Sequence, residues 1–377
     1  MGALLPNIDP DGLLEYSVVF NDRSLNHMSQ SFQTVMTDIS RGLKNAYNAD
    51  GVAVVPGGGT FGMEAIARQF ANNKKCLIIR NGWFSYRWSQ ILDQGKIASE
   101  TIVIKAVKDK ANKNAAFSPA PVEAVIKKIK SEKPSIVFAP HVETSAGLLL
   151  PDNYLQKVTE AVHSVGGIFV LDCVASGALW VDMKKTGVDV LLSAPQKGWS
   201  STPCSGLVML SSHAKQKIIH TQSNSYVCDL LKWLQIMESY EKGGHAYHST
   251  MPTDSLRQFR DTLRETEEYG FGKTREEQIN LGQEIRKILE SKGFRSVASK
   301  DFQSPSVVVS YTDNADIKSG KLFKDQGVQI AAGVPLECDE GNDFMTFRIG
   351  LFGLDKLHNI ERTVSNFKNA LDKIKVI

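Results

Sequence analysis

The sequence predicts an α/β fold with a mostly parallel sheet, followed by a smaller α+β domain. Short apolar runs alternate with helical patterns over the first two thirds of the chain, and this pattern changes after about residue 252. The length of 377 residues also exceeds what a single core usually spans. We therefore expect an N-terminal segment at 1–25, a large domain at 26–251 and a small C-terminal domain at 252–377.

Seven apolar runs predict the strands of the large domain. Most are apolar at every position, which is typical of strands covered by helices on both faces. The runs are residues 52–55, 76–79, 101–104, 135–139, 168–171, 188–192 and 207–210. Helical patterns lie between several of them, at 61–71, 121–130 and 152–164. This alternation indicates a mostly parallel seven-stranded sheet flanked by helices.

The last third of the chain has a different pattern. Two long charged helices are expected at 254–267 and 274–289. Strand-like runs follow at 306–311, 328–332 and 345–350, with a helix near 317–325. In the final segment, apolar residues three or four apart predict a closing amphipathic helix: Leu357, Ile360, Val364, Phe367, Leu371 and Ile374.

The composition argues against several classes of function. The net charge is only +3 without a long basic block, so nucleic acid is not expected as a partner. No apolar run approaches the roughly 20 residues of a membrane helix, and the start lacks the pattern of a signal peptide. The five dispersed cysteines indicate free thiols in the cytoplasm. The eight histidines show no metal-ligand spacing, so no metal is expected.

A glycine-rich turn directly follows the first predicted strand. Residues 56–64 read P-G-G-G-T-F-G-M-E and begin a helix. Glycines let the backbone approach an anion, and the N–H groups of the first helical turn point toward it. Gly57, Gly59 and Gly62 match the dinucleotide pattern G-x-G-x-x-G. However, the next strand leads into Arg80 and not into an acidic residue for a ribose. A monophosphate site fits better.

Two polar residues follow later predicted strands. Asp172 comes directly after the run at 168–171, and Lys197 lies shortly after the run at 188–192. Ligands bind at this edge of parallel sheets, and a lysine desolvated there becomes a nucleophile. Taken alone, Asp172 also fits a strand-end cap and Lys197 a solvated loop lysine. Together with an anion site, they are what a pyridoxal 5'-phosphate (PLP) enzyme requires.

Seven motifs follow one another along the chain: G-G-T at 58–60, N-G-W-F at 81–84, H-V-E-T-S-A-G at 141–147, L-D-C-V-A-S at 171–176, S-A-P-Q-K at 193–197, Y-H-S-T at 247–250 and F-R-I-G at 347–350. In this order they resemble the class V aminotransferases of fold type I, closest to the alanine–glyoxylate and serine–pyruvate branch. The resemblance runs from about His27 to the C-terminus, which is most of the sequence.

The resemblance implies a set of residues that bind PLP. The phosphate is held by Gly58, Gly59, Thr60 and Gln196, the ring lies between Phe84 and Val174, its hydroxyl lies near Thr144, and its nitrogen pairs with Asp172. Lys197 forms the internal aldimine. Tyr247 and Thr250 reach the phosphate of the neighbouring subunit, so a homodimer with shared sites is expected.

The implied reaction moves an amino group from a small amino acid to a 2-oxo acid, of the alanine or serine with glyoxylate or pyruvate type. The substrate amine displaces Lys197, which then acts as general base and acid at the substrate α-carbon. Arg348 binds the substrate carboxylate through paired, charge-assisted hydrogen bonds.

The N-terminal segment, which lines the active site in the family, departs from the family's G-P-G-P. Residues 16–23 read Y-S-V-V-F-N-D-R instead. Arg23 either binds a second acidic group of the substrate or pairs with Asp22. The family's P-P-G after the lysine is here T-P-C at 202–204. These differences leave the identity of the substrates open.

Two other activities remain as alternatives. A PLP lyase or cysteine desulfurase shares the fold, but the acidic neighbours of Cys338 raise a thiol pKa. Gln196 also replaces the histidine usual before the lysine of desulfurases. A nucleotide-dependent oxidoreductase built on the glycine turn would leave Asp172, Lys197 and Arg348 without a joint role.

Overall fold

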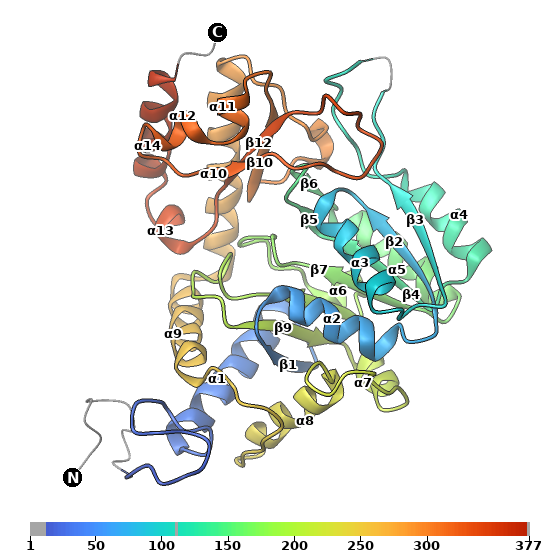
Figure 1. Ribbon diagram of the computed structural model, residues 1–377, viewed down its shortest axis with the longest axis vertical. Helices are drawn as coiled ribbons and strands as arrows, with labels where there is room; N and C mark the ends of the chain where they lie inside the picture. Colours follow the sequence, from blue (N-terminus) through green and yellow to red (C-terminus); the bar gives the residue numbers. More distant parts are fainter. Residues whose placement is uncertain (1–12, 110–111, 375–377) are drawn as a thin grey trace.

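A seven-stranded sheet forms the centre of the protein in a computed structural model that describes residues 13–109 and 112–374 (Figure 1). Its strands are β1 (Gly51–Pro56), β2 (Lys75–Arg80), β3 (Glu100–Lys105), β4 (Ile136–Pro140), β7 (Ile168–Asp172), β8 (Val190–Ser193) and β9 (Ser205–Leu210). Their order is β1-β9-β8-β7-β4-β2-β3. Only β9 runs against its neighbours, since it pairs antiparallel with both β1 and β8. The predicted mostly parallel sheet of seven strands is confirmed.

Helices cover both faces of this sheet and shield its apolar side chains. They are α1 (Gln30–Tyr47), α2 (Gly59–Phe70), α3 (Trp83–Gln94), α4 (Val122–Glu132), α5 (Asp152–Ser164), α6 (Met183–Thr186), α7 (Ser212–Ile218) and α8 (Leu230–Glu241). Strands β4, β8 and β9 are buried at every position, as expected for strands covered on both sides. Helices α2, α4 and α5 were predicted, whereas α1, α3, α7 and α8 were not.

The C-terminal part is the predicted smaller α+β region. Helices α9 (Thr253–Tyr269) and α10 (Phe271–Ser291) lead to an antiparallel sheet of β10 (Val307–Tyr311), β12 (Thr346–Gly350) and β11 (Ala331–Ala332). The remaining elements here are η1 (Lys300–Phe302), α11 (Ala315–Lys318), α12 (Lys321–Lys324), α13 (Leu354–Leu357) and α14 (Ile360–Lys373). The single helix expected at 317–325 is wrong, because Gly320 adopts a φ of +80° and separates α11 from α12.

An apolar cluster separate from the main core joins the C-terminal sheet to the large part of the chain. Val142, on the small hairpin of β5 (Val142–Glu143) and β6 (Leu148–Leu149), belongs to it. Leu179 of the large part joins Val307 and Tyr311 of β10 in the same cluster. Phe117 is fully buried there. This contact fixes β12 and its Arg348 relative to the strand ends of the large sheet.

Among the described residues, none of the helices combines the length and apolar character needed to span a bilayer. The start of the chain, for which no signal peptide is expected, lies outside the described residues. The division at residues 25 and 251 stays a prediction.

Candidate active site

The carboxyl ends of β1, β7 and β8 meet at one edge of the sheet, and a cavity lies there. It is lined by Gly59, Thr60, Met63, Phe84, Arg87, Val142, Thr144, Asp172, Val174, Ala175, Gln196 and Lys197. Most of the residues predicted to bind the cofactor are therefore brought together. Gly58 stands next to them as the N-cap of α2.

Backbone conformation or steric crowding favours glycine at three positions of the glycine-rich turn. Gly57 has a φ of +116°, which favours glycine. A Cβ on Gly59 would lie 3.0 Å from Val174 Cγ2, and a Cβ on Gly62 would lie 2.5 Å from Leu192 Cδ1. The turn thus brings the N-terminus of α2 close to the loop after β7 and packs α2 on β8 and β9. Its open end presents the first N–H groups of a helix to the cavity, an arrangement suited to an anion.

The position of Arg80 argues against a dinucleotide at this turn. Arg80 ends β2, where a ribose-binding acid would lie. Its side chain is buried and donates hydrogen bonds to Ser89 Oγ and to the Glu337 carbonyl. It therefore has a structural role in joining β2 to the C-terminal part.

Asp172 and Lys197 face the same recessed cavity from neighbouring strands. The Asp172 carboxylate accepts a hydrogen bond from the Val174 N–H at 2.9 Å. Loss of solvent around it raises the pKa of Asp172 to about 6, although this hydrogen bond and the positive charge of Lys197 act in the opposite direction. Desolvation lowers the pKa of Lys197, and Arg348 and Arg87 lower it further. Both shifts move these groups closer to neutral pH, as is common in active sites.

Three cations surround the ring of Phe84. The Arg87 and Arg348 guanidinium carbons lie 5.2 and 5.5 Å from its centroid, and Lys197 Nζ lies 5.8 Å away. The second ring beside Lys197 belongs to Phe352, at 5.4 Å. An aromatic platform surrounded by positive charge is suited to a flat, anionic ligand.

Arg348 lies on β12 of the C-terminal sheet, and its guanidinium approaches the Phe84 ring at the cavity. Its Nε donates to the Ala332 carbonyl at 2.8 Å, which orients the guanidinium. Desolvation lowers its pKa, while the negative charge of Glu143 raises it. Within the part of the chain that the structure describes, its two Nη atoms have no hydrogen-bond partner, so both can donate to a carboxylate.

Arg87 was not predicted. Its Nη1 donates to Thr60 Oγ1 at 3.2 Å, and its side chain lines the cavity. A signal for it exists in the sequence, because residues three apart share one face of a helix. Phe84 and Arg87 are such a pair on α3, so a helix prediction at this position would have placed Arg87 beside Phe84.

Glu143 holds the start of α3, which carries Phe84. The carboxylate is fully buried and accepts hydrogen bonds from the N–H groups of Phe84, Ser85 and Ser145 and from both serine hydroxyls. Only glycine fits at position 82, because a Cβ there would collide with Ser145 Oγ and Glu143 Cγ. Glu143 therefore has a structural role, since its hydrogen bonds hold the start of the helix that carries Phe84.

We expect Glu143→Gln to destabilise the chain and to weaken cofactor binding. The new amide would place an NH₂ group against donors that now meet a carboxylate oxygen. A hydrogen bond to a charged group contributes about 1.5–3 kcal/mol, and we expect a loss of this size in the free energy of unfolding. Urea denaturation measures it, and fluorescence titration measures PLP affinity. Glu160→Gln, an exposed glutamate of α5, is the matched control. Unchanged stability and affinity in Glu143→Gln would contradict this role.

Three predicted residues lie away from the cavity within this chain. Tyr247 and Thr250 are exposed, and their hydroxyl groups lie 3.0 Å apart. Arg23 is exposed in the N-terminal segment, and no ion pair with Asp22 is formed among the described residues. The structure therefore does not bring these three side chains to the site of their own chain.

Cys338 does not have the surroundings of a reactive thiol. Its side chain is 5% exposed. Burial, together with the negative charges of Glu143 and Glu340, raises the pKa of Cys338 to about 12. A desulfurase needs a mobile, ionisable cysteine, so the desulfurase alternative has no support from this residue.

The comparisons with known proteins point to one family. A family model described as aminotransferase class-V matches residues 13–340. Alanine–glyoxylate aminotransferase 1 of Saccharomyces cerevisiae is 24% identical over 94% of this chain and 91% of its own length. The 2-aminoethylphosphonate–pyruvate transaminase of Syntrophobacter fumaroxidans is 27% identical over 85% of this chain and 82% of its own. The solved alanine–glyoxylate aminotransferase of Nostoc sp. has a TM-score of 0.76 at 22% identity, over 92% of this chain and 88% of that chain.

Proposed function

The chain belongs to the class V aminotransferase family, and from this premise we propose that it uses PLP and Lys197 to move an amino group from a small amino acid to glyoxylate or pyruvate. The observation that best supports this is the convergence of Lys197 and Asp172 on one cavity lined by the start of α2. When bound there, PLP supplies an aldehyde that condenses with amines and a protonated ring that accepts electrons.

The residues present fit this cofactor. Thr144 Oγ1 is buried in the cavity wall without a hydrogen-bond partner, and buried hydroxyl groups normally have one. A ring hydroxyl would supply it. The N-terminus of α2, with Gly58, Gly59 and Thr60, would hold the phosphate together with Gln196. Arg87, bound to the Thr60 hydroxyl, adds positive charge on this side.

Asp172 and the two side chains beside it would orient the cofactor ring. Phe84 and Val174 line the cavity and would pack on the two ring faces. The Asp172 carboxylate would pair with the ring nitrogen and keep it protonated. A carboxyl with a pKa of about 6 is costly to ionise while unpaired, so a bound cation lowers this cost.

Lys197 Nζ would remove the proton from the substrate α-carbon. A general base works best when its pKa is near the working pH. Desolvation and the nearby arginines lower the pKa of Lys197, so a larger fraction of the amine is unprotonated than for a surface lysine.

We expect Arg348→Ala to raise KM for both the amino acid and the 2-oxo acid. The guanidinium would bind the carboxylate that the two substrates share, and hydrogen bonds to charged groups contribute about 1.5–3 kcal/mol each. The predicted increase in KM is on the order of 10–100-fold. Arg348→Lys keeps the positive charge but lacks the forked guanidinium, so its KM should lie between those of wild type and Arg348→Ala. Steady-state kinetics with both substrates decide this, and a KM equal to wild type would contradict the role.

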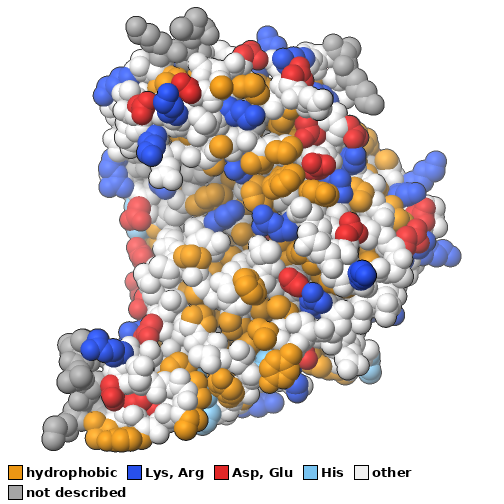
Figure 2. All heavy atoms as spheres, viewed as in Figure 1, with side chains coloured by type: hydrophobic (Ala, Val, Ile, Leu, Met, Phe, Trp, Pro, Cys, Tyr) orange, Lys and Arg blue, Asp and Glu red, His pale blue; other side chains and the backbone are white. Residues whose placement is uncertain are grey.

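We also propose a homodimer with shared active sites. Several large apolar side chains are solvent-exposed in one chain, including Tyr16 at 89%, Val18 at 101% and Tyr226 at 73%. Exposed apolar surface often marks an interface, and Figure 2 shows apolar side chains gathered over the centre and lower half of one face. In such a dimer, Tyr247 and Thr250 would reach the phosphate site of the partner subunit. Arg23 would lie near the partner's substrate.

The names of the relatives provide the first substrates to test. The purified chain with PLP is incubated with glyoxylate and alanine, serine or 2-aminoethylphosphonate, or with pyruvate and serine or 2-aminoethylphosphonate. The new amino acid is measured by chromatography. Formation of glycine or alanine at the expense of one donor supports the proposal. Formation of a cleavage product from the donor without an acceptor would favour the lyase.

We also propose the cytoplasm as the compartment, because all five cysteines are free and buried.

A further inference from the structure

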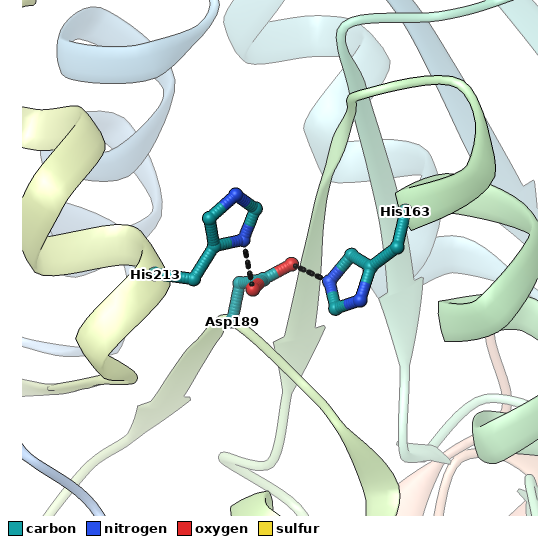
Figure 3. Close-up of side chains that lie close together, drawn as sticks. All are labelled: His163, Asp189 and His213. Atoms are coloured by element: carbon teal, nitrogen blue, oxygen red, sulfur yellow. Dashed lines mark hydrogen bonds and ion pairs between the residues drawn. The ribbon is translucent and has the colours of Figure 1, made fainter.

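Two histidines converge on one buried aspartate at the sheet edge opposite Lys197 (Figure 3). Asp189 directly precedes β8, whose other end leads to Lys197. His163 lies near the end of α5, and His213 lies in the first turn of α7. His163 Nε2 is 2.8 Å from Asp189 Oδ2, and His213 Nδ1 is 2.8 Å from Oδ1. The sequence did not suggest this cluster, because its members are more than 20 residues apart.

The cluster has the donor types that zinc prefers. The two imidazole nitrogens and a carboxylate oxygen all lie within 4.8 Å of one another. Ligands of tetrahedral zinc, with bonds of about 2.0–2.1 Å, are about 3.3 Å apart. The two histidine–aspartate distances of 2.8 Å are shorter than this, and the ligand atoms lie within 4.8 Å of one another. An ion would replace the ring protons that now face the carboxylate, and the rings would shift to bring their nitrogens to bonding distance.

The carboxylate is fixed, whereas the rings have room to adjust. The Asp189 side chain is 1% exposed, and its Oδ2 accepts the Phe169 N–H at 2.9 Å. The side chains of His163 and His213 are 39% and 40% exposed, so an ion and water can enter from solvent. The positive charge of Lys217 acts on His163, and the Lys217 Nζ is held by the Gly166 carbonyl at 2.6 Å. The cluster thus offers one fixed carboxylate and two imidazoles that solvent can reach.

We propose that His163, Asp189 and His213 bind one divalent transition-metal ion of the Zn²⁺ type, with water completing the coordination. The ion would link α5 to α7 across the end of the sheet. The four residues of β8 separate the site from the turn that bears Lys197, which is about 13 Å of strand. The metal therefore stabilises the fold and takes no part in aminotransfer.

Isothermal titration of the full, tag-free chain loaded with PLP, using zinc chloride, tests this proposal. We expect one Zn²⁺ per chain and an increase in Tm of a few degrees at saturation. His213→Gln retains a donor for Asp189 but lacks the imidazole, so its affinity should fall at least about tenfold. His163→Gln should behave likewise, while His220→Gln, an exposed histidine just beyond α7, should bind as wild type.

Two results would overturn the proposal. One is the lack of stoichiometric Zn²⁺ binding by the wild-type chain. The other is wild-type affinity in both His163→Gln and His213→Gln. Aminotransferase activity is a separate readout, which we expect to be unchanged by Zn²⁺ and by these variants. A chain that binds zinc but lacks activity would therefore leave the metal site intact and contradict only the proposed reaction.

Discussion

Replacing Lys197 with alanine is expected to reduce kcat for aminotransfer by about 10³-fold or more, because the variant loses both the amine that holds the cofactor and the general base. The side chain is desolvated, and Asp172 and two arginines act on its charge. Among the described residues, no other lysine lines this cavity, so none can take its place. Single-turnover measurement with an excess of PLP separates loss of chemistry from loss of cofactor.

A matched control and a rescue experiment make this prediction sharper. Lys127→Ala removes an exposed lysine of α4 and should leave kcat unchanged. A small primary amine added to Lys197→Ala should restore part of the activity, because it supplies a base in the space left by the side chain. Activity within tenfold of wild type in Lys197→Ala would contradict the assignment of this lysine.

The second large effect is expected for Asp172→Asn. An amide pairs poorly with a protonated ring nitrogen, so the electron sink is weakened. Removing a preorganised charge from an active site typically lowers kcat by about 10²–10³-fold. The backbone hydrogen bond from Val174 can still be accepted by the amide oxygen. The change should therefore affect chemistry and leave the fold in place.

The stability of the apoprotein provides the control for Asp172→Asn. Burial raises the pKa of Asp172 from 3.8 to about 6. The folded chain therefore binds this proton more tightly than the unfolded chain. That stabilising contribution is complete below about pH 4 and is lost as the pH rises through about 6. At pH 8 the ionised carboxylate is unfavourable, so Asp172→Asn should have a Tm equal to or above that of wild type. A lower Tm together with full activity would contradict this account.

The strands of the central sheet were predictable because buried parallel strands are apolar at nearly every position. All seven runs correspond to strands of the central sheet. The antiparallel direction of β9 could not be predicted, since its sequence is as apolar as that of β8. Helix α1 was missed although it is amphipathic, with Phe32, Val35, Ile39 and Leu43 buried on one face.

The candidate site was predictable to the extent that strand ends determine it. Asp172 and Lys197 follow neighbouring parallel strands, so their proximity follows from the fold. Arg87 and the network around Glu143 depend on the position of α3, which was not predicted as a helix. The His163, Asp189 and His213 cluster depends on how α5 and α7 pack at the other edge of the sheet, which spacing along the chain does not reveal.

The most direct test of the central claim is the visible absorption of the purified chain with PLP during addition of one amino donor and then one 2-oxo acid. We predict a band of lysine-bound cofactor that is absent in Lys197→Ala. It should disappear when the donor is added and return only when the 2-oxo acid follows. A band that recovers without the 2-oxo acid while the donor is consumed would identify a lyase. The lack of any band after addition of PLP would contradict the account as a whole.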